Sequence, residues 1–145
     1  MTLYLDTSSL VKLYVAESDS DTVRAHADRA TIVATSTIAY PEARAALARR
    51  RRERALRPAA FAAAKRKLEA DWPKFFAVQV TEAVCQDAGQ LAERYALRGY
   101  DSVHLACFLE VARQVGVADT EFSSFDERLT SAARRGARAL ARALP

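Results

Sequence analysis

The sequence predicts an α/β sandwich with a mostly parallel central sheet. Short apolar segments of strand length alternate with longer segments of helical periodicity along all 145 residues. Half of the residues are hydrophobic, which is enough to bury a core without disulfides or a structural metal. No repeat, linker or low-complexity stretch divides the chain, so we expect one domain over residues 1–145.

Four segments have the composition of strands. β-branched and aromatic residues are frequent in them, and cap or turn residues follow. The first segment stops at Asp6, and the hydroxyl residues 7–9 after it are suited to cap a helix. We predict strands over residues 2–5, 31–35, 75–80 and 121–125.

The segments between these strands have helical spacing of apolar residues. Pro58 suits the first turn of a helix, and Arg98 with Gly99 suits a helix end. Gly136 is predicted to end the last helix, with an edge strand over 137–141 after it. Helices are predicted from Leu10 onward and over residues 18–30, 36–57, 59–72, 81–97, 102–115 and 126–135.

A leader segment, a membrane helix or a cysteine motif would indicate where the protein acts and whether it binds zinc. No basic leader precedes an apolar run, and no apolar run reaches the roughly 20 residues of a membrane helix, so we expect a cytoplasmic protein. Cys85 and Cys107 are isolated in apolar contexts. We expect both thiols to be buried, with no zinc site and no disulfide.

Four carboxylates fall just beyond predicted strand ends or at a helix start. Asp6 directly follows the first strand, Glu42 lies in the first turns after the second, and Asp126 follows the last. Asp101 begins the buried helix of residues 102–115. Functional residues of a parallel sheet lie beyond the carboxyl ends of its strands, so we expect these four side chains to meet.

Such a meeting predicts a cation. Four carboxylates in one pocket repel one another and lose solvation, which raises their pKa values. A bound cation relieves this cost, and all-oxygen ligands favour Mg²⁺ or Mn²⁺ over zinc. The chemistry expected is phosphodiester hydrolysis. The hydroxyls of Thr7, Ser8 and Ser124 are placed to orient the carboxylates.

Each acid also has a simpler interpretation. An aspartate after a strand often only caps the next helix, and Glu42 has arginines nearby to pair with. Asp119 and Glu121 compete with Asp126 as the fourth ligand, and we prefer Asp126 because it directly follows a strand. Three further acids are expected to be solvated at a helix start: Glu17, Asp19 and Asp21.

The two histidines do not indicate a nucleophilic mechanism. His104 lies one helical turn after Asp101 and faces an apolar stretch, so we expect a buried structural residue. His26 lies in a polar helix and is expected in solvent. Neither has a serine or cysteine nucleophile beside it in the sequence.

The net charge of +4 is concentrated in one segment. Seven arginines and one acid lie between Arg44 and Arg57, so this segment carries +6 and the rest of the chain −2. A basic patch suits a polyanion, and its lack of aromatic residues favours contact with the phosphate backbone of RNA. We expect phosphate contacts from Arg49, Arg50, Arg51 and Arg52, and a solvated helix face is the alternative.

Four stretches together resemble PIN-domain ribonucleases, and most closely the VapC-type toxins of bacterial toxin–antitoxin pairs. They occur in the family's order, as LDTSSLVKLY (5–14), YPEARAAL (40–47), LRGYDSVHLA (97–106) and FSSFDERL (122–129). The resemblance implies a three-layer α/β/α fold, Mg²⁺-dependent cleavage of RNA, a homodimer and a cognate antitoxin. It assigns the metal site and the catalysis to Asp6, Glu42, Asp101 and Asp126.

The antitoxin's C-terminal segment is expected to lie between residues 10–15 and the segment after Tyr40. It would place an arginine or lysine against the carboxylates and rest on the apolar side chains of Leu13, Tyr14 and Val15. The alternative is that these side chains, Leu13 and Val15 above all, belong to the core. Two other functions stay open. One is a DNA nuclease or phosphatase with the same acids, and the other is a non-catalytic nucleic-acid-binding or protein-interaction module.

Overall fold

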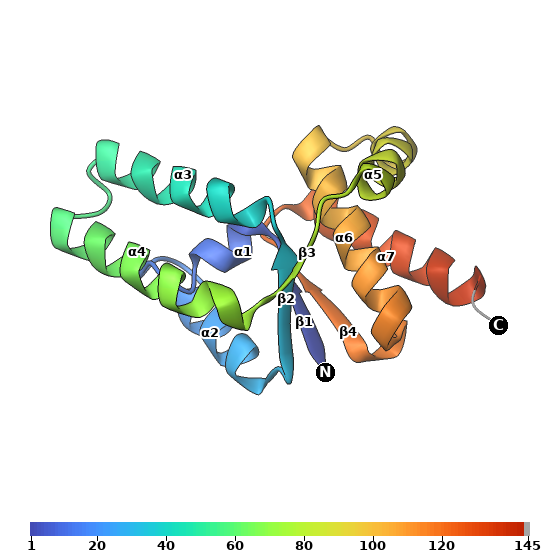
Figure 1. Cartoon of the computed structure of the whole chain (residues 1–145), viewed down its shortest axis with the longest axis horizontal. Helices are drawn as coiled ribbons and strands as arrows, with labels where there is room; N and C mark the ends of the chain where they lie inside the picture. Colours follow the sequence, from blue (N-terminus) through green and yellow to red (C-terminus); the bar gives the residue numbers. More distant parts are fainter. Residues whose placement is uncertain (144–145) are drawn as a thin grey trace.

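A four-stranded parallel sheet runs through the middle of the molecule, in the order β3-β2-β1-β4 (Figure 1). The computed structural model describes residues 1–143. The strands are β1 (Thr2–Leu5), β2 (Ile32–Ser36), β3 (Phe76–Val78) and β4 (Thr120–Ser123). All four predicted strand segments are confirmed, although β3 is shorter than predicted.

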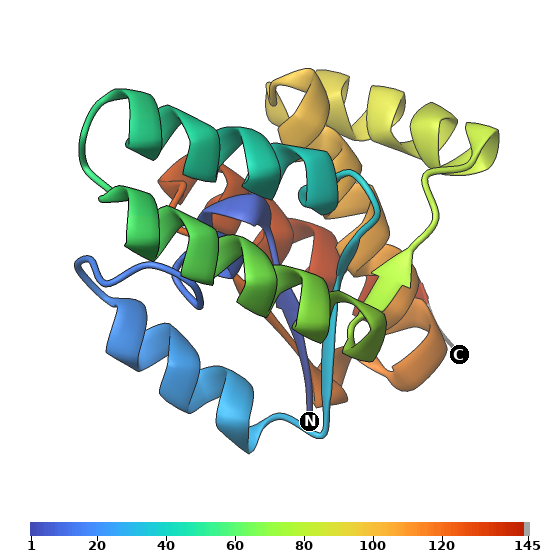
Figure 2. The ribbon, with the colours of Figure 1, turned by 60° about the vertical axis from the view of Figure 1, so that its left-hand side comes forward.

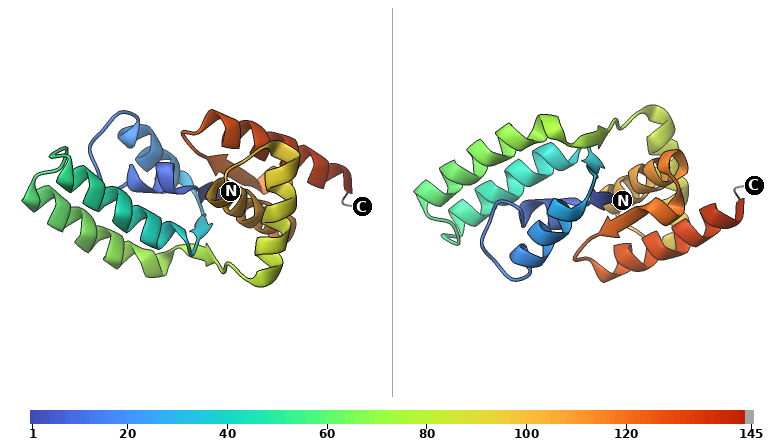
Figure 3. Two further views of the ribbon diagram at one scale, coloured as in Figure 1. Left: turned by 90° about the horizontal axis from the view of Figure 1, so that it is seen from above. Right: turned by 90° about the horizontal axis from the view of Figure 1, so that it is seen from below.

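Within the described residues, four helices cover one face of the sheet and three cover the other (Figures 1 and 3). The first group is α1 (Thr7–Val11), α2 (Ser20–Arg29), α3 (Ala39–Arg52) and α4 (Pro58–Asp71). The second group is α5 (Glu82–Tyr95), α6 (Gly99–Val115) and α7 (Glu127–Ala143). Two 3₁₀ turns, η1 (Trp72–Lys74) and η2 (Val117–Asp119), precede β3 and β4. The three-layer α/β/α fold is confirmed.

Strand β1 separates two hydrophobic cores. Leu3 and Leu5 lie in the core shared with α1 to α4, whereas Tyr4 lies in the core shared with α5 to α7. Side chains of a strand alternate between the faces of a sheet, so both faces of β1 are buried. This explains why β1 is apolar without interruption.

The parallel register brings the carboxyl ends of three strands to one edge. Leu5 pairs with Ser123, and Tyr4 pairs with Ala34, so Asp6 comes next to the end of β4 and beside the end of β2. Helix α3 starts close to this edge and then runs antiparallel to α4, as Figure 2 shows. The fold therefore places Glu42, in the first turn of α3, near Asp6.

Three predicted helix ends are wrong. Helix α3 ends at Arg52, although the helix was predicted through residue 57. Helix α5 ends at Tyr95, its C-cap Ala96 is left-handed with φ 53°, and Gly99 instead begins α6. Helix α7 runs through Gly136 to Ala143, so no helix end and no edge strand occur over 136–141. A Cβ on Gly136 would lie 3.2 Å from Leu109 Cδ1, so this glycine lets α6 and α7 approach closely.

The cysteine prediction is half right. Cys107 is buried in the core, whereas Cys85 is exposed on α5 and the prediction of a buried thiol there is wrong. Both are free, as predicted. Among residues 1–143, no helix has the length and apolarity needed to cross a membrane.

Candidate active site

Asp6 is the buried centre of the site. It follows β1, caps α1 and is 5% exposed. Its Oδ1 accepts hydrogen bonds from Ser8 Oγ at 2.7 Å and from the Ser9 amide at 3.0 Å, and its Oδ2 accepts one from Ser124 Oγ at 2.5 Å. The proposed cap and the proposed functional position thus coincide in one residue.

The buried carboxylate of Asp6 has no salt-bridge partner among the described residues. Burial raises the pKa of its carboxyl, although the hydrogen bonds from Ser124, Ser8 and Ser9 and the charge of His104 act in the opposite direction. Within residues 1–143, no basic side chain forms a salt bridge with it. A cation at this position would relieve the cost of that buried charge.

Glu42 is held by two side chains from other elements. Its Oε1 accepts a hydrogen bond from Thr7 Oγ1 at 2.6 Å and lies 2.9 Å from Nε2 of His104. Burial alone would raise the pKa of Glu42, but the hydrogen bonds from His104 and Thr7 and the charge of His104 outweigh it and lower the pKa. Glu42 is therefore kept ionised and oriented.

His104 links Glu42 to the core, as a buried residue in α6. It is 2% exposed, and its Nδ1 lies 3.0 Å from the hydroxyl of Tyr4. The expectation of a buried histidine is confirmed, but its contact with Glu42 was not foreseen. A spacing of 62 residues along the chain gives no signal of such a contact.

Asp101 and Asp126 share one guanidinium. Arg98 donates from Nε to Oδ2 of Asp101 at 2.9 Å, and its Nη2 lies 3.6 Å from Oδ2 of Asp126. The other oxygen of Asp126 accepts the Leu129 amide in the first turn of α7 at 2.8 Å. Arg98, which was predicted only as part of a helix end, supplies positive charge to both carboxylates.

Hydroxyl groups connect the parts of the site. Ser124 Oγ binds Asp6 and accepts the amide of Asp126 at 3.0 Å, and Ser9 Oγ lies 2.9 Å from Ser123 Oγ. The structure thus joins Asp6 to Asp126 through Ser124 and Asp101 to Asp126 through Arg98. In the described part of the chain, no three acidic, histidine or cysteine side chains converge closely enough to hold a metal as they stand.

The chemical type of the four candidate ligands suits a hard cation. All four candidate ligands offer carboxylate oxygens, which suit Mg²⁺ or Mn²⁺. Asp6 supplies an uncompensated buried charge, and Arg98 supplies a cationic group where two of the other carboxylates face each other. These two observations indicate that the site is built around positive charge.

Comparison with known proteins identifies the family. The family model described as "PIN domain" matches residues 3–135, which is most of the chain. The chain belongs to the PIN domain family. It is 42% identical over 109 residues to Ribonuclease VapC45 of Mycobacterium tuberculosis strain CDC 1551, a match that covers 75% of this chain and 76% of that protein. Ribonuclease VapC49 of strain H37Rv matches with the same values. The predicted resemblance to VapC-type proteins is confirmed.

Several acids of this PIN domain lie outside the site. Asp119 is in η2, before β4, and Glu121 pairs in register with Leu3, so both lie toward the opposite ends of the strands from Asp6. Glu121 instead contacts the half-buried His26 at 2.6 Å, so the expectation that His26 is simply solvated is wrong. The position of Asp126 supports it as the fourth candidate.

The arginine run lies at the far end of α3 from Glu42. Arg50 pairs with Glu17 at 3.0 Å and Arg49 with Glu53 at 2.9 Å, so two of the four guanidinium groups already have acidic partners. Glu17 also contacts Lys12, so it is an ion-pair residue and not a free solvated acid. Arg51 and Arg52 form no salt bridge with any described residue.

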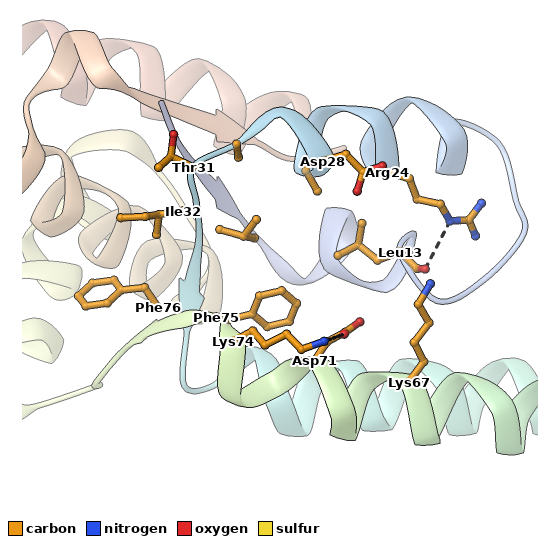
Figure 4. Close-up of a pocket in the computed structure, with 13 residues that line it drawn as sticks. Leu13, Arg24, Asp28, Thr31, Ile32, Lys67, Asp71, Lys74, Phe75 and Phe76 are labelled. Atoms are coloured by element: carbon orange, nitrogen blue, oxygen red, sulfur yellow. Dashed lines mark hydrogen bonds and ion pairs between the residues drawn. The ribbon is translucent and has the colours of Figure 1, made fainter.

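A hollow of about 700 Å³ lies between α2, the start of β2 and the end of α4, away from the acids (Figure 4). Leu13, Phe75 and Phe76 line it, together with basic and acidic side chains that include Lys67 and an ion pair of Lys74 with Asp71. Leu13 is half-buried, as an anchor for a partner requires. Tyr14 and Val15 are only 8% and 4% exposed, so both belong mostly to the core, although they line a second hollow together with Leu13.

Proposed function

We propose that this PIN domain is a Mg²⁺-dependent endoribonuclease and the toxin of a toxin–antitoxin pair. The observation that carries the proposal is the buried, uncompensated carboxylate of Asp6 at the carboxyl end of β1. Relatives named as ribonucleases supply the substrate class, which is RNA.

Asp6, Glu42, Asp101 and Asp126 would hold Mg²⁺, and Mn²⁺ suits the same oxygen donors. When bound, the cation supplies positive charge for the phosphate and lowers the pKa of water. Ser8 and Ser124 fix both oxygens of Asp6, and Thr7 and His104 fix Glu42. Such hydrogen bonds hold a ligand in one orientation and raise its affinity for metal.

Cleavage of a labelled RNA, with a DNA strand of the same sequence beside it, tests the proposal. Wild type should cut the RNA with Mg²⁺ and lose activity in EDTA, and Asp6→Asn should lose it by more than 100-fold. Asp87→Asn, on exposed α5, is the matched control and should cut like wild type. RNA cleavage in EDTA would overturn the metal requirement. Preferential cleavage of the DNA strand would show that the protein is a DNA nuclease.

The toxin role implies partners and a place of action. We infer that the protein acts in the cytoplasm as a homodimer and that an antitoxin blocks it. The antitoxin's C-terminal segment would lie between residues 10–15 and the segment after Tyr40, with an arginine or lysine against the carboxylates. The hollow beside Leu13 would offer it further apolar side chains with a rim of mixed charge. Expression in bacteria should arrest growth, co-expression of the adjacent small protein should restore it, and Asp6→Asn should be harmless. Harmless wild-type expression without a co-purifying partner would contradict the toxin role.

A further inference from the structure

Phe125 is an exposed aromatic ring at the edge of the acidic site. It lies between Ser124, which binds Asp6, and the candidate ligand Asp126, and it is 45% exposed. Its amide donates to Ser8 Oγ at 3.0 Å, and the same hydroxyl donates to Asp6. The backbone of Phe125 and the carboxylate of Asp6 are therefore fixed by one group.

The ring is also held in place. Lys12 Nζ lies over it, 4.5 Å from the ring centre, and Lys12 is itself tied to Glu17 and to the carbonyl oxygen of Ser18. A cation over an aromatic face is an attractive contact. An exposed ring with this many constraints is pre-organised, which lowers the entropy cost of binding a ligand to it.

Phe125 forms part of a hollow of about 510 Å³ whose other lining residues are Ser124, Glu127, Thr130, Ser131 and Arg134. A hollow of this volume suits a small ligand. It offers an aromatic ring, hydroxyl groups, a carboxylate and a guanidinium. Arg134 is exposed on α7 and forms no salt bridge with any residue among 1–143.

We propose that this hollow is a nucleotide subsite that binds an unpaired base and phosphate of the RNA next to the cleaved bond. The base stacks on Phe125, Arg134 binds a phosphate, and Glu127 accepts a hydrogen bond from an amino group of the base. Bases inside an RNA duplex are stacked on one another and do not reach such a ring. The subsite therefore selects single-stranded RNA. The inference rests on the proposed ribonuclease function and adds the residues that would bind one nucleotide of its substrate.

Binding in EDTA separates this inference from cleavage. The probe is a short single-stranded RNA with 2-aminopurine at successive positions, whose fluorescence falls when it stacks on a ring. Phe125→Leu should weaken binding about tenfold, about 1.4 kcal/mol, and abolish the change at one position. Phe125→Trp should retain the affinity for the RNA and the fluorescence change at that position. Phe61→Leu, at a half-buried phenylalanine of α4 that also lies under a lysine and is outside the hollow, should bind RNA like wild type.

Arg134 is tested by the salt dependence of the same binding. Arg134→Gln should reduce the log–log slope by about 0.7, the value for one phosphate contact on a single strand. Arg142→Gln removes the same charge about 12 Å further along α7 and should leave the slope unchanged. An equal loss in both variants would show a diffuse charge effect and overturn the subsite.

Several outcomes overturn the inference. These are unchanged binding by Phe125→Leu, equal affinity of wild type for duplex and single strand, or loss of self-association in Phe125→Leu with RNA binding intact. The last would assign the ring to a protein interface. Binding that follows the predictions in a protein that does not cut RNA would instead overturn the proposed function and leave the subsite standing.

Discussion

Ser124 donates a hydrogen bond of 2.5 Å to Asp6, although 118 positions separate them in the sequence. The same serine oxygen accepts the amide of Asp126. One hydroxyl thus contacts both the buried carboxylate that follows the first strand and the residue just before the last helix.

Ser124→Ala should weaken the site without unfolding the protein. Loss of a hydrogen bond to a charged group costs about 1.5–3 kcal/mol of unfolding free energy, and loss of such an orienting group costs about 10- to 100-fold in metal affinity. Titration calorimetry with Mg²⁺ and cleavage rates measure both effects. Ser18→Ala, at an exposed serine, is the control. Wild-type Mg²⁺ affinity in Ser124→Ala would show that the hydroxyl does not orient a ligand.

Asp6→Asn should stabilise the metal-free protein at neutral pH. Burial raises the pKa of Asp6, so the folded state holds this proton more tightly than the unfolded chain does. Stability from the neutral carboxyl is present at low pH and is lost as pH rises through the folded-state pKa. The melting temperature of Asp6→Asn in EDTA should exceed that of wild type by about 3 °C per kcal/mol of relieved cost. The difference should shrink as pH falls toward the pKa of Asp6. A constant difference would contradict the argument.

His104→Ala should change both stability and the pH profile. The hydroxyl of buried Tyr4 loses a partner and a cavity forms, which together cost about 2–4 kcal/mol. The pKa of Glu42 should rise, because burial raises it and the opposing groups of His104 are gone. The acid limb of the cleavage rate should then move to higher pH. His26→Ala is the control, and an unmoved limb with reduced stability would make His104 purely structural.

The four arginines of α3 should behave differently from one another. Arg51→Gln with Arg52→Gln should reduce the salt dependence of RNA binding by about 0.7 log–log units for each phosphate that is no longer bound. Arg50→Gln should instead lower the melting temperature, because Glu17 then loses a partner. An unchanged slope in the double variant would assign the run to a solvated face or to a protein contact.

Gly136→Ala should stabilise the protein by about 0.5–1 kcal/mol. Alanine favours a helix over glycine, and the nearest atom to the new Cβ is the end of the half-buried, flexible Leu109 side chain. That side chain also borders a hollow of about 270 Å³, which gives it room to move. Gly136→Val should destabilise, since its added bulk presses on the same neighbour. Thermal unfolding measures the stability of both variants. A Gly136→Ala variant less stable than wild type would show that the Leu109 side chain of α6 cannot move aside.

The strands were predictable because each one is a short apolar segment followed by cap residues, as at Leu5 and Asp6. The end of α7 was not, because α7 continues through Gly136, where the helix packs closely against α6. The short length of β3 was also missed, since only residues 76–78 pair with β2.

Three candidate acids were predictable from their positions after strands, and Asp101 from its position at a helix start, whereas their partners were not. The link between Glu42 and His104 and the bridge from Arg98 to Asp126 depend on how separate helices pack. Such contacts follow from three-dimensional neighbours, which one sequence does not display. Arg98 lies only three residues before Asp101, so a local ion pair was the one detectable signal.

The strand order has a consequence for the time at which this site comes into existence. Asp6 is among the first residues to leave the ribosome, but its amide needs the Ser123 carbonyl and its carboxylate needs Ser124. At 5–20 residues per second, the chain grows for about 6–24 seconds before those partners are made. During that interval the growing chain, still attached to its own messenger RNA, lacks the residues that complete the site. Because β4 lies late in the sequence, the contacts that complete the candidate site form only near the end of synthesis.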